Sequence, residues 1–448
     1  MARAKKETAL TPEERLQAAL VPDWEWPYKL PENWCWTYLG VVSEIVMGQS
    51  PAGKSTTNDS SYMPLIGGAA DMGELYPQVS RFTKTPTKQS QTDDVILSIR
   101  ATLGRPIFSD GIYCLGRGVV AFRSSIVTKE FLRYFFIDQE NYLYQNATGT
   151  TFAQVDSKTL KSMPFPLPPF HEQRRIVRRV ESLFTKLDEA KDKAQKVVDE
   201  FKTRKAAILH KAFTGELTAK WREEHDVGME SWEKKRLSDV VTEFKYGTSE
   251  KSDYNNKGIP VLRIPNIGDN GIDLSDIKYL NHRNVDSESQ IHEGDILIIR
   301  SNGSRDLVGK AVLVPELGCE YAYASFLIRA KPNHSIINAH YLTIFLNSTD
   351  ARRQMFRRAK SSAGINNINT KELGAISLTV PSLPEQDEIV HIINEMMDKD
   401  QQSKEAAEAV LDQIDLMKKS ILARAFRGEL GTNDPSEESA VELLKQLI

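Results

Sequence analysis

The sequence predicts a mixed α/β protein in which two similar α/β domains alternate with two long helices that pair as an antiparallel coiled coil. A segment of the chain recurs without a gap 213 residues further on: Glu172-Gln173 returns as Glu385-Gln386, and Ile208-Leu209 returns as Ile421-Leu422. Apolar residues follow a heptad spacing within both copies. The stretches before the two copies also share short motifs. Such a duplication indicates internal pseudo-symmetry and two partly different targets.

Composition limits the class of protein. The 448 residues are enough for two or three cores, and 40% hydrophobic with 27% charged residues is ordinary for a soluble chain. No apolar run approaches membrane-spanning length, and the first residues lack the apolar stretch of a signal peptide. Cys35, Cys114 and Cys319 have no paired or metal-ligand spacing, which is typical of a reducing compartment. We therefore expect a cytoplasmic protein that does not interact with membranes.

The two copies, residues 171–220 and 384–430, are predicted to be long helices. Each follows a proline-rich lead-in and ends near a glycine, Gly215 or Gly428, which are common boundary signals. In the first copy the apolar rows are Ile176, Leu183, Ala190 and Val197, and Val180, Leu187, Ala194, Phe201 and Ile208. In the second copy they are Ile389, Met396, Val410 and Met417, and Ile393, Ala407, Ile414 and Ile421.

The charges of the two copies are opposed. Residues 171–220 carry 13 basic and 8 acidic groups, whereas residues 384–430 carry 6 basic and 11 acidic groups. Opposed flanks favour pairing between the copies over self-pairing. We therefore expect an intramolecular antiparallel helix pair, stabilised by the basic flank of Arg174, Arg175, Arg178 and Arg179.

The two remaining globular stretches are related to each other. Residues 1–170 hold an N-terminal extension and a first domain, residues 221–383 hold a second domain, and residues 431–448 form an acidic tail. Trp34 corresponds to Trp232, the strand pattern ending at Arg100 corresponds to the one ending at Arg300, and the helix pattern at 131–135 corresponds to 341–345. Both domains are expected to mix helices, strands and long loops.

One motif suggests an enzyme. Residues 48–55 satisfy the phosphate-loop pattern, with Lys54 in the lysine position. That loop needs a helix that begins at the lysine, yet a serine- and threonine-rich stretch ending at Pro64 follows. We therefore expect a polar loop, and a nucleotide hydrolase that uses Lys54 is only a weak alternative. The histidines show no metal-ligand spacing, and the sequence contains no nucleophile elbow or adenine methyltransferase motif. No catalytic residues and no metal site are predicted.

The strongest binding signal lies at 351–369. Arg353, Arg357 and Lys360 are predicted to share one helix face suited to phosphate oxygens, and a following loop carries Asn366 and Asn367, whose amides can bind adenine edges. A solvated basic face and structural salt bridges explain such residues equally well. With the strand ends of both domains, the candidate DNA-binding residues are Arg100, Thr102, Arg105, Thr150, Gln154, Arg263, Asn266, Arg300, Asn302, Ser304, Arg305, Arg353, Arg357, Lys360, Asn366 and Asn367.

Taken in order, these motifs resemble one family over nearly the whole chain. The chain resembles the DNA-specificity subunit of Type I restriction-modification systems in four motifs. Two mark the long helices: Glu-Gln-x-x-Ile-Val at their starts (172 and 385) and Ile-Leu-x-x-Ala-Phe-x-Gly-Glu-Leu at their ends (208 and 421). The other two are Leu-Pro-x-x-Trp at 30–34 and Leu-Thr-Ala-Lys-Trp-Arg at 217–222. The residues expected to pair the helices and dock other subunits are Glu172, Gln173, Ile176, Val180, Leu183, Leu187, Phe201, Ile208, Phe213, Glu385, Gln386, Ile389, Ile393, Ile414, Ile421 and Phe426.

The resemblance implies a non-catalytic, nucleoid-associated DNA-binding subunit. Each target-recognition domain would recognise half of a bipartite, asymmetric double-stranded DNA site. The helix pair would set the spacer and dock two modification subunits, which bind S-adenosylmethionine and methylate adenine N6. Restriction subunits, where present, would use ATP and Mg²⁺, and this chain would bind no cofactor. The N-terminal extension departs from the family pattern, and we expect it to meet the acidic tail. A coiled-coil scaffold with two protein-binding heads is the main alternative.

Overall fold

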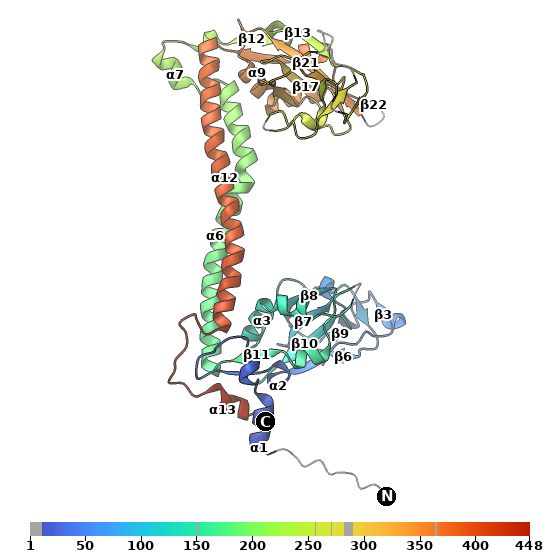
Figure 1. The fold of residues 1–448 in the computed structure, drawn as a ribbon, viewed down its shortest axis with the longest axis vertical. Helices are drawn as coiled ribbons and strands as arrows, with labels where there is room; N and C mark the ends of the chain where they lie inside the picture. Colours follow the sequence, from blue (N-terminus) through green and yellow to red (C-terminus); the bar gives the residue numbers. More distant parts are fainter. Residues whose placement is uncertain (1–10, 150–151, 256, 270, 282–289, 363–364) are drawn as a thin grey trace. The chain divides into compact units, whose positions relative to one another are not determined.

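The computed structural model describes residues 11–149, 152–255, 257–269, 271–281, 290–362 and 365–448. The chain forms two compact units (Figure 1). The first comprises Met1–Ala194 with Ala409–Ile448, and the second comprises Gln195–Glu408. Each unit contains one α/β domain and part of both long helices, so the predicted mixed α/β class is confirmed. No helix in the described ranges is both long and apolar enough to cross a membrane.

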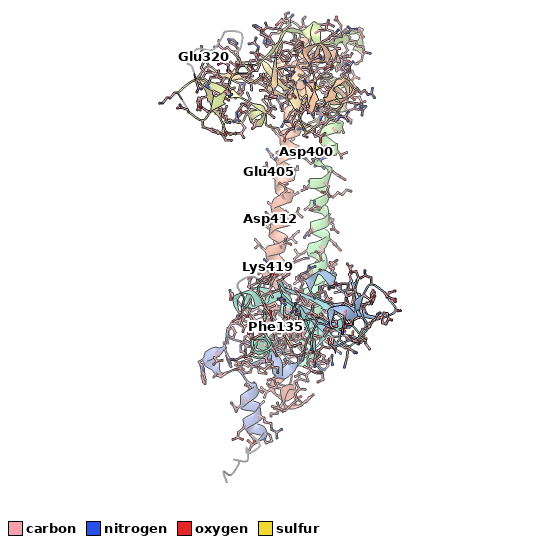
Figure 2. All side chains as sticks on the ribbon, turned by 90° about the vertical axis from the view of Figure 1, so that its right-hand side faces the viewer. Phe135, Glu320, Asp400, Glu405, Asp412 and Lys419 are labelled. Carbon is pink, nitrogen blue, oxygen red and sulfur yellow. The ribbon has the colours of Figure 1, made fainter. Side chains whose placement is uncertain are left out.

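The two long helices are α6 (Phe170–Phe213) and α12 (Leu383–Phe426), each of 44 residues. Shortly after each helix comes a glycine in the left-handed region, Gly215 at φ 83° and Gly428 at φ 72°, as the sequence predicts. In the first unit Lys418 of α12 binds Asp188 of α6. In the second unit Arg204 Nε of α6 lies 2.6 Å from Asp400 Oδ1 of α12. Figure 2 labels Asp400 on α12. Early residues of α6 thus meet late residues of α12 and vice versa, which confirms the antiparallel pairing.

The heptad prediction is correct for α6 and half correct for α12. Ile393, Ala407 and Ile414 are buried as expected. In the other predicted row Ile389 is buried, but the row is wrong from Met396 onward, because Met396, Val410 and Met417 are exposed at 38%, 40% and 48%. The contacts with α6 are made by the residues that follow the predicted heptad positions. Lys404 Nζ lies 5.2 Å from the ring centroid of Phe201, and Lys418 Nζ lies 5.1 Å from that of Phe184. A straight helix drifts against a strict seven-residue repeat, so the inner face moves to the next residue.

The contacts of the basic flank differ from the expected pairing with the acidic flank of α12. Arg175 binds Glu172 and Glu437, and the Arg174 guanidinium lies 4.8 Å from the Phe170 ring centroid. The ion pairs between the helices have mixed polarity: Asp188 on α6 meets Lys418, whereas Lys191 on α6 meets Asp415. The net charge of a whole segment does not determine which of its side chains face the partner helix.

The domain of the first unit is built on two sheets. In one sheet the order β2 (Glu44–Met47), β10 (Val119–Arg123), β7 (Val95–Arg100) and β8 (Thr102–Phe108) is antiparallel throughout. The other has the order β3 (Thr56–Thr57), β5 (Phe82–Thr83), β4 (Met63–Ile66), β9 (Cys114–Leu115) and β6 (Lys88–Gln89). The domain also holds α2 (Leu39–Val42), α3 (Lys129–Asp138), α4 (Glu140–Gln145) and α5 (Ser157–Lys161), and β1 (Cys35–Tyr38) pairs with β11 (Pro164–Leu167).

The domain of the second unit repeats this arrangement. Its antiparallel sheet has the order β13 (Val241–Tyr246), β21 (Leu327–Pro332), β17 (Ile296–Ile299) and β19 (Ala311–Leu313). A second sheet contains β14 (Ser252–Asp253), β16 (Lys278–Leu280), β15 (Pro260–Leu262) and β20 (Ala322–Tyr323). The pair β1–β11 recurs as β12 (Glu233–Arg236) with β24 (Ser377–Val380). The predicted kinship of the two domains is thereby confirmed.

Short helices complete the second domain, and it has one sheet more. The helices are α7 (Ala219–Glu224), α8 (Leu237–Val240), α9 (Ala339–Leu346), α10 (Thr349–Arg358) and α11 (Thr370–Gly374). A three-stranded sheet has the order β18 (Ser301–Asn302), β23 (Ile365–Asn367) and β22 (Lys360–Ser362).

Repeated phenylalanines anchor the long helices to the domains. Phe426 of α12 packs against Phe131 and Phe135 of α3, with ring centroids 5.0 and 5.7 Å apart (Figure 2 labels Phe135). Phe213 of α6 packs in the same way against Tyr341 and Phe345 of α9, at 5.4 and 5.3 Å. Each domain therefore shares a core with the end of one helix and the start of the other.

The N-terminal extension meets the C-terminal tail, as expected from the sequence. The extension forms α1 (Pro12–Ala19), and the tail forms α13 (Ala440–Lys445). Arg15 Nη1 donates to the Ile448 carbonyl at 3.0 Å, and the Asn33 carbonyl accepts from Ala440 N at 2.9 Å. Ala440 and Leu444 are buried in the core of the first unit. The two ends of the chain thus complete one domain together.

Candidate nucleic-acid interface

In the second unit the candidate surface is centred on Arg300, which directly follows β17. Its guanidinium lies 4.4 Å from the ring centroid of Tyr246, which is exposed at its position at the end of β13. Arg300 Nε also donates to Asn367 Oδ1 at 3.4 Å. Stacking and hydrogen bonding hold the cation in one orientation while its surroundings remain open to solvent.

Asparagines lie beside Arg300 on paired strands. The sequence places Asn366 and Asn367 in a loop, but they belong to β23, where Asn366 pairs with Asn302 and Asn367 pairs with Ser301. The strand forms because the residues after Arg300 offer a free edge to the chain that returns from α10. The Asn302 side chain accepts from Ser304 N at 2.7 Å, which closes the turn after β18. The structure therefore brings Arg300, Asn302, Ser304, Asn366 and Asn367 together on one surface.

A second cluster surrounds the α10 residue Phe356. Arg305 and Arg352 lie 5.3 and 4.9 Å from its ring centroid. A hollow of about 470 Å³ is lined by these residues with Asn347, Thr349, Arg353 and Arg357. The Arg352 guanidinium donates hydrogen bonds to the carbonyls of Val308 and Asp306, and burial lowers its pKa. The Arg353 guanidinium lies 3.8 Å from Asp350, and both groups are more than half exposed. Arg353 and Arg357, one helical turn apart, therefore remain the cations best placed for an anion.

Three predictions for the second domain need correction. Lys360 does not share the helix face of Arg353 and Arg357, because α10 ends at Arg358 and Lys360 begins β22; its side chain lies outside the described residues. Asn266 is only 1% exposed and donates to the carbonyls of Asp273 and Asp276, so it holds a loop together. Arg263 likewise binds the Asp276 carboxylate at 3.0 Å. Both side chains are used in hydrogen bonds and ion pairs within the domain, as buried polar groups usually are.

In the first unit the corresponding surface follows β7. Arg100 ends this strand, and a tight turn through Ala101 (φ 65°) leads to the exposed Thr102. Arg105 is also exposed, with φ 54°. Within the described ranges neither arginine has a side-chain hydrogen bond or ion pair. Gln154 forms a bridge with Arg100, so the structure brings Arg100, Thr102 and Gln154 together, whereas Thr150 lies outside the described residues.

The phosphate-loop alternative is not supported by the local fold. Residues Gly53–Ser55 form a single 3₁₀ turn that leads directly into β3, rather than a helix that starts at Lys54. Ser55 is buried, and its hydroxyl donates to the Ala52 carbonyl at 2.7 Å. This loop cannot present a helix N-terminus to a phosphate. Among the described residues, no cluster of His, Cys, Asp or Glu could hold a metal ion.

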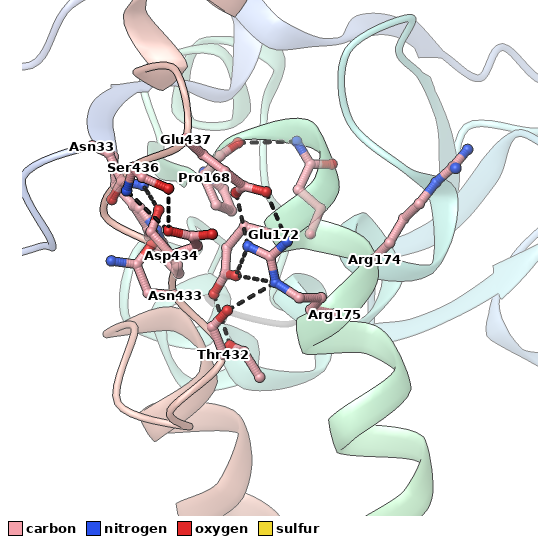
Figure 3. Close-up of polar contacts among 12 residues, drawn as sticks. Asn33, Pro168, Glu172, Arg174, Arg175, Thr432, Asn433, Asp434, Ser436 and Glu437 are labelled. Atoms are coloured by element: carbon pink, nitrogen blue, oxygen red, sulfur yellow. Dashed lines mark hydrogen bonds and ion pairs between the residues drawn. The ribbon is translucent and has the colours of Figure 1, made fainter.

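The repeated Glu-Gln pairs are fully buried, and we correct their predicted role as a docking surface. In the first unit Glu172 accepts from the Thr432 hydroxyl at 2.7 Å and from Arg175, whose guanidinium also makes two 2.7 Å hydrogen bonds to Glu437 (Figure 3). Burial raises the pKa of the Glu172 carboxyl, against the opposing effect of these hydrogen bonds. The start of α6 is thereby tied to the chain that follows α12.

In the second unit Glu385 makes the equivalent connection. Its carboxylate accepts from the Thr218 hydroxyl at 2.7 Å, from Arg222 Nη1 at 2.7 Å and from Trp232 Nε1 at 3.0 Å. Arg222 also donates to the Gly215 carbonyl at 2.6 Å. The start of α12 is thus tied to the chain that follows α6. We refer to these two clusters as the Glu172 lock and the Glu385 lock.

The hydrogen bonds of Gln173 and Gln386 match each other still more closely than those of the two glutamates. Gln173 Oε1 accepts from Thr128 N at 2.9 Å, and its Nε2 donates to the Ile126 and Pro168 carbonyls. Gln386 makes the same three bonds to Asn338 N and to the Ile336 and Pro381 carbonyls. Each glutamine therefore fixes the first turn of a long helix to its own domain. The sequence signals the pairs by their repetition but does not show their partners.

Two α/β domains with cationic, amide-bearing surfaces, carried in one chain by paired helices, define a duplicated binding protein. A model described as "Type I restriction modification DNA specificity domain" matches residues 31–198 and 229–411. The chain belongs to this family.

Two relatives agree with this assignment, and one solved structure shares the fold. The chain is 27% identical over 430 residues to the Type I restriction enzyme EcoKI specificity subunit of Escherichia coli K12, and 24% identical over 428 residues to the StySPI specificity subunit of Salmonella potsdam. Each match covers 90% of both chains. The crystal structure of the HsdS subunit from Thermoanaerobacter tengcongensis has the same fold, with a TM-score of 0.63, 20% identity, and coverage of 90% of this chain and 99% of that one.

Proposed function

We propose that this chain is the non-catalytic DNA-specificity subunit of a Type I restriction-modification complex. In this proposal each α/β domain recognises one half of a bipartite, asymmetric site in double-stranded DNA. Membership of the specificity family carries the proposal. The equivalent surfaces that begin at Arg100 and at Arg300 support it, because a two-part site requires one such surface in each domain.

The chemistry of these surfaces suits recognition of DNA. Guanidinium groups bind phosphates and guanine edges, and amide side chains bind adenine edges. We assign base contacts to the surfaces around Arg100 and Arg300, and phosphate contacts to Arg353 and Arg357 at the hollow beside Phe356. A chain with a net charge of −3 has only modest attraction for DNA by itself, so partner subunits are expected to supply further positive charge.

We further propose that two modification subunits dock on the paired helices. The exposed apolar residues of α12 support this proposal: in the first unit Val410, Leu416 and Met417 are exposed at 40%, 66% and 48%. Apolar side chains on a charged helix fit the apolar centre of a protein interface. In this scheme the partners bind S-adenosylmethionine and methylate adenine N6, restriction subunits use ATP and Mg²⁺, this chain binds no cofactor, and the complex is nucleoid-associated.

Mapping methylated adenines in the host genome tests the proposal. Cells with the intact gene should carry N6-methyladenine at one bipartite sequence with a constant gap, and deletion of the gene for this chain should abolish the mark. Restoring the gene with Arg300→Ala should weaken or change methylation through one half-site, whereas Lys54→Ala should leave it unchanged. A methylation pattern that does not respond to the deletion would refute the proposal. A scaffold with two protein-binding heads would give that result.

A further inference from the structure

The two domains share one feature that the polar contacts leave unexplained. Phe152 in the first domain and Ile365 in the second are exposed at 58% and 52%. A single exposed apolar side chain is ordinary on a protein surface. Phe152 and Ile365, however, occupy the same position of the duplicated fold, so a common function for them can be tested.

Local contacts establish the equivalence. Asp156 caps α5 by accepting from Thr159 N at 2.8 Å, and Asn369 caps α11 by accepting from Glu372 N at 2.8 Å. Phe152 and Ile365 each lie four residues before the cap, so the 213-residue offset of the repeat extends to them. The segment before each cap is also fixed to the end of the corresponding strand, with the acceptor shifted by one residue relative to the two arginines: Val155 N donates to the Ile99 carbonyl, and Ile368 N donates to the Arg300 carbonyl.

Both side chains lie beside the proposed base-contacting groups. In the first domain the Ala153 carbonyl, next to Phe152, accepts from Ala101 N at 2.9 Å in the turn after Arg100. In the second domain Ile365 and Asn367 are alternate residues of β23 and so point to the same side of the strand. Asn367 is a partner of Arg300. Each apolar side chain thus projects from a surface whose other groups are cationic or amide-bearing.

We propose that Phe152 and Ile365 are wedges, one in each domain, that enter the DNA base stack and open a base step within the half-site that their domain recognises. The proposal rests on the proposed function. Proteins that distort DNA commonly insert apolar side chains between base pairs, which partly unstacks the step and bends the duplex. An opened step also lowers the energy needed to extrude a nearby base for methylation. The wedges therefore link recognition of the site to access to its target adenine.

The fluorescence of 2-aminopurine tests this inference, because unstacking makes this base analogue brighter. The full chain is assembled with its modification subunits and added to duplexes that carry one analogue at successive positions of each half-site, outside the methylated adenines. Phe152→Ala should abolish the signal in one half-site only, and Ile365→Ala in the other only. Each change should weaken binding by roughly tenfold, as expected for loss of a stacked side chain.

Matched variants separate the possible outcomes. Phe152→Leu keeps an apolar wedge and should retain most of the signal. Ile112→Ala changes an apolar residue that is 56% exposed in the loop after β8. Thr102 begins β8 and Ile112 follows its other end, so this variant should alter neither the fluorescence signal nor the binding. Normal binding of the split site without any unstacking signal, or with a signal that Phe152→Ala does not alter, overturns the wedges but leaves the proposed function intact. Absence of site-specific binding by the unaltered complex overturns both.

Discussion

Glu172 and Glu385 are equivalent in the repeat, yet the structure predicts that their loss has unequal effects. Arg222, the partner of Glu385, has a side chain that is only 9% exposed. In Glu385→Ala its guanidinium keeps only neutral acceptors, the Gly215 carbonyl and the Thr218 hydroxyl, and Trp232 Nε1 loses its acceptor. Loss of one partner from a buried ion pair costs about 3–5 kcal/mol.

Glu172→Ala should cost less. Arg175 has a side chain that is 32% exposed and retains its two hydrogen bonds to Glu437. The remaining loss is chiefly the hydrogen bond from Thr432, together with the partly screened contact to Arg175. We expect about 1–2 kcal/mol. The two equivalent substitutions should therefore differ by roughly 2–3 kcal/mol in local stability.

Hydrogen exchange in the full-length protein measures this difference, because the locks act on local segments rather than on a single two-state transition. Glu385→Ala should speed exchange of residues 215–232 by more than about 100-fold, since each 1.4 kcal/mol is a factor of ten. Glu172→Ala should speed exchange of residues 427–440 by roughly tenfold. The double variant Glu385→Ala with Arg222→Met removes the unpaired charge and should recover most of the loss. Equal effects of the two single substitutions, or no recovery in the double variant, would refute the reasoning.

Three further outcomes are expected. Arg353→Gln combined with Arg357→Gln should reduce the slope of log Kd against log salt by about 2 without changing the preferred sequence, and an unchanged slope would exclude phosphate contacts. Insertion of four residues into each long helix adds about 6 Å of rise. The DNA spacer between the two half-sites should therefore lengthen by about two base pairs, with both half-sites unchanged. Altered half-sites in the methylation map would contradict a spacer role for the helices. The hydrogen bonds from Arg175 lower the pKa of Glu437 below its usual 4.5, so this carboxylate stabilises the tail above that pH and the contribution is lost as pH falls through the lowered pKa. Proteolysis of the tail should therefore accelerate in acid, and Glu437→Gln should remove the part of that dependence due to this carboxylate, whereas an identical profile in both proteins would exclude the contact.

The sequence could be interpreted correctly wherever a local pattern repeats. The 213-residue offset identified the two helices, because a duplicated segment with heptad spacing has few alternatives to pairing with its own copy. The correspondence of the strands that precede Arg100 and Arg300 also followed from the chain, since both strands are short and buried. The arginines themselves are one residue out of register, because Ile99 N and Arg300 N make the matching hydrogen bonds to the carbonyls just before β10 and β21. Weak helix propensity after Lys54 was enough to reject a phosphate loop.

Other features depend on contacts between residues far apart in the chain, and these were decided only by the tertiary structure. One of the two rows of α12 lies one residue away from its predicted position after Ile389, because a straight helix drifts against a strict seven-residue repeat. The sequence predicts Asn266 as a base-contacting residue, whereas its side chain donates to loop carbonyls, because the sequence does not distinguish a polar side chain that faces solvent from one that holds a loop.

The sequence by itself determined that the chain is a duplicated protein with two related domains and two pairing helices, because periodicity and repetition are properties of the chain alone. The tertiary structure determined which repeated residues are buried. Glu172 meets Thr432, and Glu385 meets Arg222, across separations of 260 and 163 residues. Partners at such separations are chosen by the packing of whole elements, and no local spacing encodes them.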